Sequence, residues 1–191
     1  WSTMLMLGLR PGEALALQWS AIDFEQSVLH VRRALRNGTN GLEITENLKT
    51  VRSRRSLQMP APLVTALQDH RHAHDGERAH AMEAWSTEWP DLVFTTQFGT
   101  PINGSNLRRD FARLTESAGL GRWTPNELRH TAVSLLSAEG LALERIADIV
   151  GHTGTRMTAK VYRHVLTPSV DHAVGPMDAL FGTLPSESTV E

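Results

Sequence analysis

The spacing of apolar and polar residues along the chain predicts a mostly helical protein with one small sheet. Residues 27–33 alternate between apolar and polar side chains, as a strand with one buried face does. Residues 42–45 and 55–60 show a similar short extended pattern, and Asn-Gly pairs after the first segment mark turns. We expect these segments to form a small antiparallel three-stranded sheet, with Lys49 near the turn of its second hairpin.

Much of the remaining chain has the apolar spacing that is typical of helices. Pro11 suits the first turn of a helix, and Glu13 lies where a carboxylate interacts favourably with the helix dipole. Gly140 and Gly151 are placed as helix stops. The predicted helical segments are residues 1–9, a helix from Pro11, and residues 62–84, 103–117, 125–139, 143–150 and 155–165. The fold class is therefore α+β and mainly helical.

The length of 191 residues predicts one domain with a sizeable core. We assign residues 1–168 to this domain and expect its N-terminal edge to be truncated, because an apolar run follows Trp1 almost at once. Residues 169–191 form a C-terminal segment, in which residues 177–181 could dock as a short apolar helix before a disordered end.

The composition excludes several kinds of protein. The chain has no cysteine, which excludes disulfides, thiolate metal sites and cysteine nucleophiles and is compatible with the cytoplasm. No apolar run approaches the roughly 18 residues of a membrane span, so no membrane association is expected. His70 and His74 have the i, i+4 spacing that permits metal binding, but no third ligand is evident. We interpret them as a solvated helix face and predict no metal.

The charge distribution favours a nucleic-acid partner more than the net charge of −2 does. Residues 171–191 carry four of the 21 acidic residues and no lysine or arginine, which leaves 19 basic against 17 acidic residues elsewhere. Residues 30–60 carry seven basic residues against two acidic ones. Such a basic ribbon can contact phosphates, and Arg52, Arg54 and Arg55 are candidate DNA-binding residues within it. The alternative is a solvated hairpin surface.

Four residues could together attack a phosphodiester without a metal. Tyr162 is the only tyrosine and follows His152 by ten positions. A tyrosine hydroxyl can attack phosphorus and form a covalent intermediate. Arg10 and Arg129 offer planar, permanently charged forks that suit the non-bridging oxygens of a phosphate. The leaving alkoxide then needs a proton, which a lysine on a hairpin could deliver.

Four sequence motifs, in this order, resemble those of the tyrosine site-specific recombinases, the phage-integrase family. They are GLRPGEALALQWSAID at 8–23, LKTVRSRRSLQMP at 48–60, TPNELRHTAVSLL at 124–136 and VGHTGTRMTAKVYRHV at 150–165. The resemblance implies the DNA breaking-rejoining catalytic fold and catalysis without cofactor, metal or ATP. It also implies the catalytic residues Arg10, Lys49, Arg129, His152 and Tyr162, with Glu13, Asn126 and His130 as supporting residues.

One position departs from the family pattern. The third motif usually reads His-x-x-Arg, but its first position here is Asn126. Asparagine cannot act as a general base, although its amide can still donate a hydrogen bond. Three alternatives follow: the enzyme works without an imidazole there, it is slowed or inactive, or His130 or His152 takes over part of the role.

The resemblance implies a recombinase that integrates or excises a mobile element through a 3'-phosphotyrosyl intermediate. Its expected partners are double-stranded DNA and further copies of the chain, as a homo-tetramer on paired recombination sites with exchanged C-terminal segments. A DNA-binding domain is expected ahead of residue 1, and the expected location is the bacterial cytoplasm, at the nucleoid. The alternatives are an enzyme resembling type IB topoisomerases, which relaxes supercoils without a partner site, and an inactive DNA-binding remnant.

Overall fold

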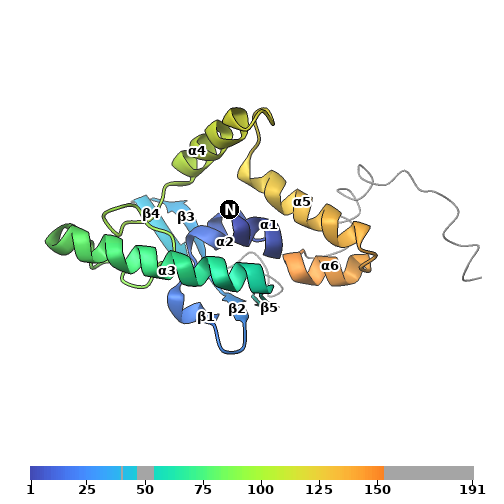
Figure 1. Cartoon of the computed structure of the whole chain (residues 1–191), viewed down its shortest axis with the longest axis horizontal. Helices are drawn as coiled ribbons and strands as arrows, with labels where there is room; N and C mark the ends of the chain where they lie inside the picture. The colour runs from blue at the N-terminus through green and yellow to red at the C-terminus, as the bar shows by residue number, and fades with distance from the viewer. Residues whose placement is uncertain (40, 47–53, 153–191) are drawn as a thin grey trace, which may run out of the picture.

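The computed structural model describes residues 1–39, 41–46 and 54–152 and confirms a mainly helical α+β fold (Figure 1). The helices are α1 (Ser2–Leu7), α2 (Pro11–Leu15), α3 (Ala61–Ala81), α4 (Gly104–Ser117), α5 (Pro125–Ala138) and α6 (Leu143–Val150), with 3-10 turns η1 (Trp19–Ala21) and η3 (Met82–Ala84). The strands are β1 (Ile22–Asp23), β2 (Val28–Val31), β3 (Ala34–Gly38), β4 (Gly41–Thr45) and β5 (Arg55–Gln58). The helices predicted at 155–165 and 177–181 lie outside the described residues.

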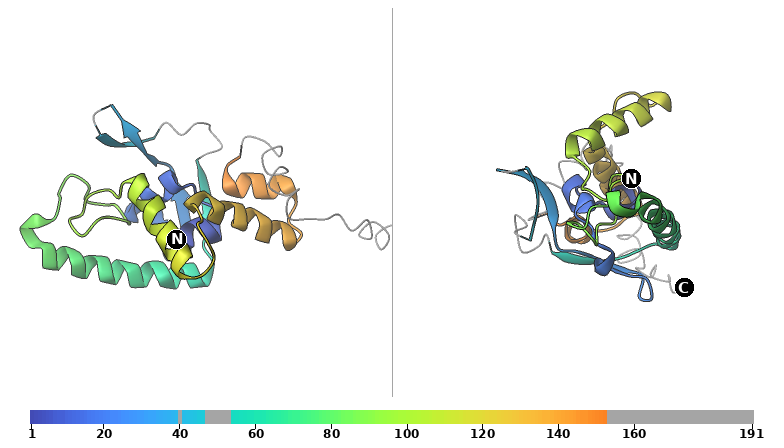
Figure 2. Two further views of the ribbon diagram at one scale, coloured as in Figure 1. Left: turned by 90° about the horizontal axis from the view of Figure 1, so that it is seen from above. Right: turned by 90° about the vertical axis from the view of Figure 1, so that its left-hand side faces the viewer.

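The sheet has three antiparallel strands, but its membership differs from the prediction. Its order is β1-β2-β5, whereas β4 pairs with β3 in a separate two-stranded hairpin. The assignment of residues 42–45 to the main sheet was therefore wrong. The reason is a second apolar cluster: Leu35 of β3, with Leu42 and Ile44 of β4, packs against Leu15 and Leu107 rather than into the main core. Figure 2 shows this hairpin projecting on the side of the molecule opposite α3.

The main core lies between the sheet, α1, α2 and the long helix α3. Leu9, Leu29, Leu63 and Val93 are at most 1% exposed within it. Residues 92–96, predicted as a short extended piece, make only isolated bridges, Gln18 with Leu92 and Thr95 with Pro101. Burial of this apolar surface is the main force that holds α2, the sheet and α3 together.

His70 and His74 do not form the solvated helix face that was predicted. Nε2 of His70 lies 2.7 Å from the carbonyl oxygen of Val93, and Nε2 of His74 lies 3.1 Å from the hydroxyl of Thr95. The residues at 92–96 cover this face of α3, and burial lowers the pKa of His74. Both rings also lie against Trp19. These histidines therefore serve packing between α3 and the loop beside it.

In the described part of the chain, no helix has both the length and the apolar character of a membrane span. No group of three or more histidine and acidic side chains there is arranged to hold a metal ion.

Gly8 lets the end of α1 approach the end of α6. It caps α1 with a left-handed backbone, φ +62°, and a Cβ atom there would lie 2.7 Å from Cγ1 of Val150. Helix α5 packs on both α1 and α6, so the three helices converge at this point (Figure 1). Because Arg10 follows two residues after Gly8, this approach brings the start of α2 to the end of α6.

We expect Gly8→Ala to lower the free energy of unfolding by about 3 kcal/mol, from the left-handed backbone and the clash with Val150. The matched control is Gly140→Ala, which has φ +80° but no atom within 4 Å of the added Cβ. It should cost only about 1 kcal/mol. Urea unfolding of both variants measures the difference, and equal losses would contradict the proposed close approach.

Candidate active site

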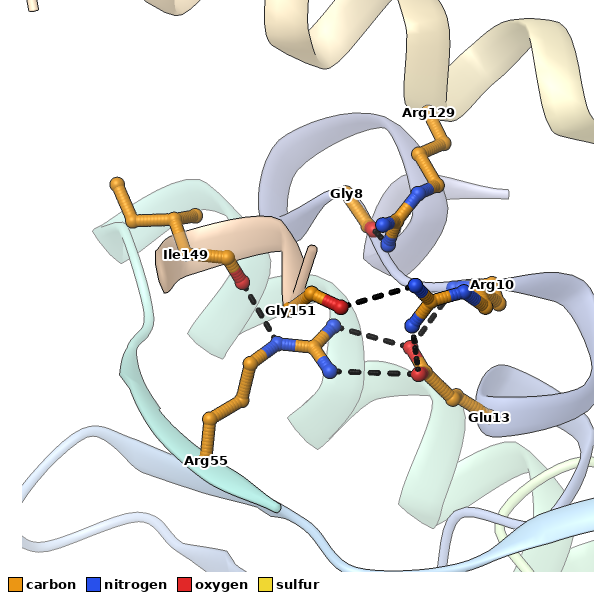
Figure 3. A network of polar contacts seen from close by, with 7 residues as sticks. All are labelled: Gly8, Arg10, Glu13, Arg55, Arg129, Ile149 and Gly151. Atoms are coloured by element: carbon orange, nitrogen blue, oxygen red, sulfur yellow. Dashed lines mark hydrogen bonds and ion pairs between the residues drawn. The ribbon is translucent and has the colours of Figure 1, made fainter. Parts of the chain in front are cut away.

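The buried carboxylate of Glu13 is the centre of a polar cluster between α2, β5 and α6 (Figure 3). Glu13 lies in the first turn of α2 and is 3% exposed. Its Oε1 lies 2.7 Å from Nη1 of Arg10, and its Oε2 lies 2.9 Å from Nη2 of Arg55. The backbone N–H of Arg10 also donates to Oε2, at 2.9 Å. Burial raises the pKa of Glu13, but hydrogen bonds and charge from Arg55 and Arg10 outweigh it, so the pKa is lowered.

Arg10 joins the start of α2 to the end of α6. Its side chain is 40% exposed, so part of the guanidinium faces solvent. While Nη1 donates to Glu13, Nη2 donates to the carbonyl oxygen of Gly151 at 2.9 Å. The C-terminal carbonyls of a helix lack partners within the helix and carry partial negative charge, so a cation there is favoured. Arg10 is thereby held in place with one edge accessible.

Arg129 reaches the same region from α5 and, within the described part of the chain, has one donor nitrogen without a partner. It is 5% exposed, and its Nη1 donates to the carbonyl oxygen of Gly8 at 2.5 Å. Its Nη2 is buried and has no hydrogen-bond partner among the described residues. Burial, and then the charge of Arg10, lowers the pKa of Arg129 to about 9, so the group is still charged at neutral pH. A buried cation with a free donor is suited to an anionic ligand.

His152 follows directly on the cap of α6. Gly151 adopts a left-handed backbone, φ 68°, and the N–H of His152 then donates to the carbonyl oxygen of Ala147 at 2.9 Å. Burial, and then the charge of Arg129, lowers the pKa of His152 to about 4. The ring is therefore neutral at pH 7, and one of its nitrogens can donate a hydrogen bond while the other accepts one.

The cluster as a whole is positively charged. Arg10, Arg55 and Arg129 carry three positive charges, and Glu13 is the acidic residue in contact with two of them. Figure 3 shows the guanidinium groups of Arg10 and Arg129 beside Gly8 and Gly151, where four segments of the chain meet. Such a site can bind an anion through paired donors and stabilise charge that develops on its oxygens.

The other predicted site residues lie at different places. Asn126 is exposed in the first turn of α5 and borders a cavity of about 190 Å³ that Pro11 and Gly12 also line. His130 is exposed, and its charge contributes to the lowered pKa of His152. Arg54 is exposed and donates to the backbone carbonyl of Glu46 at 3.3 Å. Lys49, Arg52 and Tyr162 lie outside the described residues.

The buried position of Arg55 in the site was not predicted from the sequence. Its side chain is 7% exposed and points inward to Glu13, although it was predicted as a DNA-binding residue of the basic ribbon. The signal was present in the strand: Arg55 and the buried Leu57 are two residues apart, and so share one face of β5. Direct DNA contact by Arg55 stays a prediction.

A sequence profile of the phage integrase family matches residues 2–168, and the chain belongs to that family. It is 36% identical over 189 residues to an integrase of Streptomyces ambofaciens, covering 93% of this chain and 46% of that protein. It is 31% identical over 186 residues to a XerC-like tyrosine recombinase of Caldanaerobacter subterraneus subsp. tengcongensis, covering 91% and 47%. Both relatives are named as recombination enzymes and not as topoisomerases.

Solved structures agree with this assignment. The integrase of transposon Tn1549, solved in complex with a circular intermediate DNA, is 25% identical, with a TM-score of 0.73 over 93% of this chain and 57% of that one. XerA recombinase is 23% identical and has the same fold, with a TM-score of 0.63 over 96% of this chain and 57% of that one. The chain spans about half the length of the curated relatives it matches.

We expect the His152 ring to titrate near pH 4 because burial and the neighbouring arginines oppose its protonation. Since the unfolded chain takes up this proton near pH 6.5, the contribution of His152 to stability is complete above that pH and declines as pH falls towards 4. NMR of the ring nitrogens measures the midpoint, with His152→Asn identifying the signal. A midpoint near 6.5 would contradict the described environment.

Proposed function

We propose that this chain is the catalytic domain of a site-specific DNA recombinase that cleaves and rejoins DNA through a 3'-phosphotyrosyl intermediate. The observation that carries the proposal is the pairing of Arg10, partly exposed, with Arg129, whose buried Nη2 has no partner among the described residues. Both lie in a positively charged cluster of a phage-integrase-family chain. The Tn1549 integrase, solved with DNA, supports DNA as the substrate.

The chemistry assigns one role to each predicted residue. The hydroxyl of Tyr162 gives its proton to solvent and its oxygen attacks the scissile phosphorus, so that a bond from the tyrosine oxygen to phosphorus forms and the bond to the 5'-oxygen breaks. Arg10 and Arg129 bind the non-bridging oxygens, on which negative charge accumulates. His152, neutral at pH 7, donates a hydrogen bond to the phosphate. Lys49 gives a proton to the departing 5'-oxygen.

The 5'-hydroxyl of a partner strand reverses this step. It gives its proton to Lys49, which the first step left neutral, and attacks the phosphotyrosyl phosphorus. The bond from phosphorus to the tyrosine oxygen breaks, that oxygen takes up a proton from solvent, and the DNA backbone is restored without ATP. We extend the proposal to a homo-tetramer on paired sites, with residues 169–191 as the exchanged segment, and to a DNA-binding domain ahead of residue 1. The bacterial cytoplasm, at the nucleoid, is the proposed location, and a mobile element is the proposed DNA.

Replacement of Tyr162 by phenylalanine should abolish covalent attachment to DNA while DNA affinity changes by less than about threefold, because only the nucleophilic oxygen is lost. The measurement is a denaturing gel after incubation with nicked fragments from the ends of the protein's own element, with and without a preceding DNA-binding domain. An adduct that persists in the variant would refute the nucleophile. DNA binding without an adduct in the wild type would identify a binding-only remnant.

Asn126→Ala should slow adduct formation about 10- to 100-fold, because the hydrogen bond from Asn126 to the charged phosphate that it would lose contributes about 1.5–3 kcal/mol. Asn126→His should keep at least the wild-type rate, since imidazole can donate in the same place. Single-turnover cleavage of the nicked fragments measures both. An unchanged rate in Asn126→Ala would show that another residue donates this hydrogen bond to the phosphate. The same measurement on His130→Ala would then test whether that residue is His130.

A further inference from the structure

Arg55 makes a set of contacts that no surface DNA ligand would need. Its Nη2 and Nη1 lie 2.9 and 3.3 Å from the two carboxylate oxygens of Glu13, so the two side chains meet in parallel. Its Nε donates to the carbonyl oxygen of Ile149 at 2.6 Å. The side chains of Arg55 and Glu13 are 7% and 2% exposed. All three donor nitrogens of the guanidinium thus face the interior.

These contacts join three segments that carry predicted catalytic residues. Glu13 fixes the start of α2, where Arg10 lies, and Ile149 is in the last turn of α6, three residues before His152. Arg55 begins β5 and follows Lys49 by six positions in the sequence. Figure 3 shows Arg55 entering the cluster from β5, with its guanidinium between the Ile149 carbonyl and the Glu13 carboxylate. One guanidinium therefore connects the sheet to both α2 and α6.

The charge of Arg55 affects how many hydrogen-bond donors of the Arg10 guanidinium Glu13 occupies, and so how many could bind a phosphate. Glu13 is buried, and a buried carboxylate without adequate compensation is strongly unfavourable. With Arg55 in place, its fork compensates that charge, and Arg10 can share its own donors between Glu13 and Gly151. Without Arg55, Arg10 would be the remaining cation in contact with Glu13 and would be drawn towards it. The positive charge of the cluster would also fall by one.

We infer that Arg55 is a positioning residue that compensates Glu13, and thereby leaves the exposed part of the Arg10 guanidinium available to the scissile phosphate, while its own Nε holds the end of α6 beside Arg10. This inference rests on the proposed recombinase function. It differs from the direct DNA contact predicted from the sequence. Lysine cannot replace Arg55 fully, because an ammonium group lacks the planar fork that matches both carboxylate oxygens and the Ile149 carbonyl at once.

The test is a charge-compensation cycle with Arg55→Gln, Glu13→Gln, the double variant and Arg55→Lys. Arg55→Gln should slow adduct formation about 100-fold, because it leaves a buried carboxylate with one partner fewer. The double variant removes that carboxylate as well. Its rate of adduct formation should be at least about tenfold higher than that of Arg55→Gln, since the effects of substitutions at residues in contact are not additive. Arg55→Lys should fall between wild type and Arg55→Gln. Arg113→Gln, which removes a 72% exposed charge on α4, should change the rate less than about twofold.

The pH dependence of the rate of adduct formation distinguishes compensation of the Glu13 charge from a merely structural role of Arg55. In Arg55→Gln the burial that raises the pKa of Glu13 is no longer offset by Arg55, so the carboxyl takes up a proton at higher pH than in the wild type. The rate of Arg55→Gln relative to the wild type should therefore increase as pH falls. The double variant has no such carboxyl and should not show that increase. Equal losses in Arg55→Gln and the double variant, at every pH, would overturn the inference.

A second readout keeps this inference distinct from the proposed function. Inorganic phosphate is titrated into the wild type and each of the same variants, and binding is followed through the NMR signals of the His152 ring. Weaker phosphate binding in Arg55→Gln, restored in the double variant, supports the role of Arg55 even if the wild type forms no adduct with DNA. The absence of an adduct in the wild type would then refute the recombinase chemistry and leave the role of Arg55 standing. Unchanged phosphate affinity in Arg55→Gln would refute the role of Arg55, whatever the wild type does to DNA.

Discussion

The arrangement of this site depends on one buried carboxylate that two arginines share. Glu13 places a negative charge where only 3% of the residue is exposed, and Arg10 and Arg55 both turn towards it. Each arginine also donates to a carbonyl oxygen at the end of α6. The anion therefore orients cations that would otherwise repel one another, and the cluster keeps a surplus of positive charge for a ligand.

The regular elements could be predicted from the sequence because their signals are local. Pro11 and Glu13 mark the start of α2, and Gly151 ends α6 with the left-handed backbone expected of a helix stop. The pairing of β4 with β3 rather than with the main sheet was not predictable in this way. It depends on which apolar cluster accepts Leu35 and Ile44, and that is decided by tertiary contacts.

The site was predictable in composition but not in detail. Motif order pointed to Arg10, Arg129 and His152, and the structure places them in one cluster, while their catalytic roles stay predictions. The carbonyl oxygens that hold the arginines have no sequence signal, because every residue carries one. Arg55 was hidden among the arginines of a basic ribbon, and only its alternation with the buried Leu57 distinguishes it. His70 and His74 were predicted to form a solvated helix face, but their i, i+4 spacing reflects packing against the residues at 92–96. Nothing local in the sequence indicates that this loop covers them.

The hydrogen bonds of the cluster span great distances along the chain. Arg10 reaches a residue 141 positions away, Arg129 one 121 positions away and Arg55 one 94 positions away. Closing loops of this length costs conformational entropy that only the folded core repays. The cluster therefore cannot be complete before α5 and α6 have docked on the start of α2. A chain still emerging from the ribosome has Arg10 but neither Arg129 nor Gly151, so the cluster cannot assemble until nearly all of the described residues have been made.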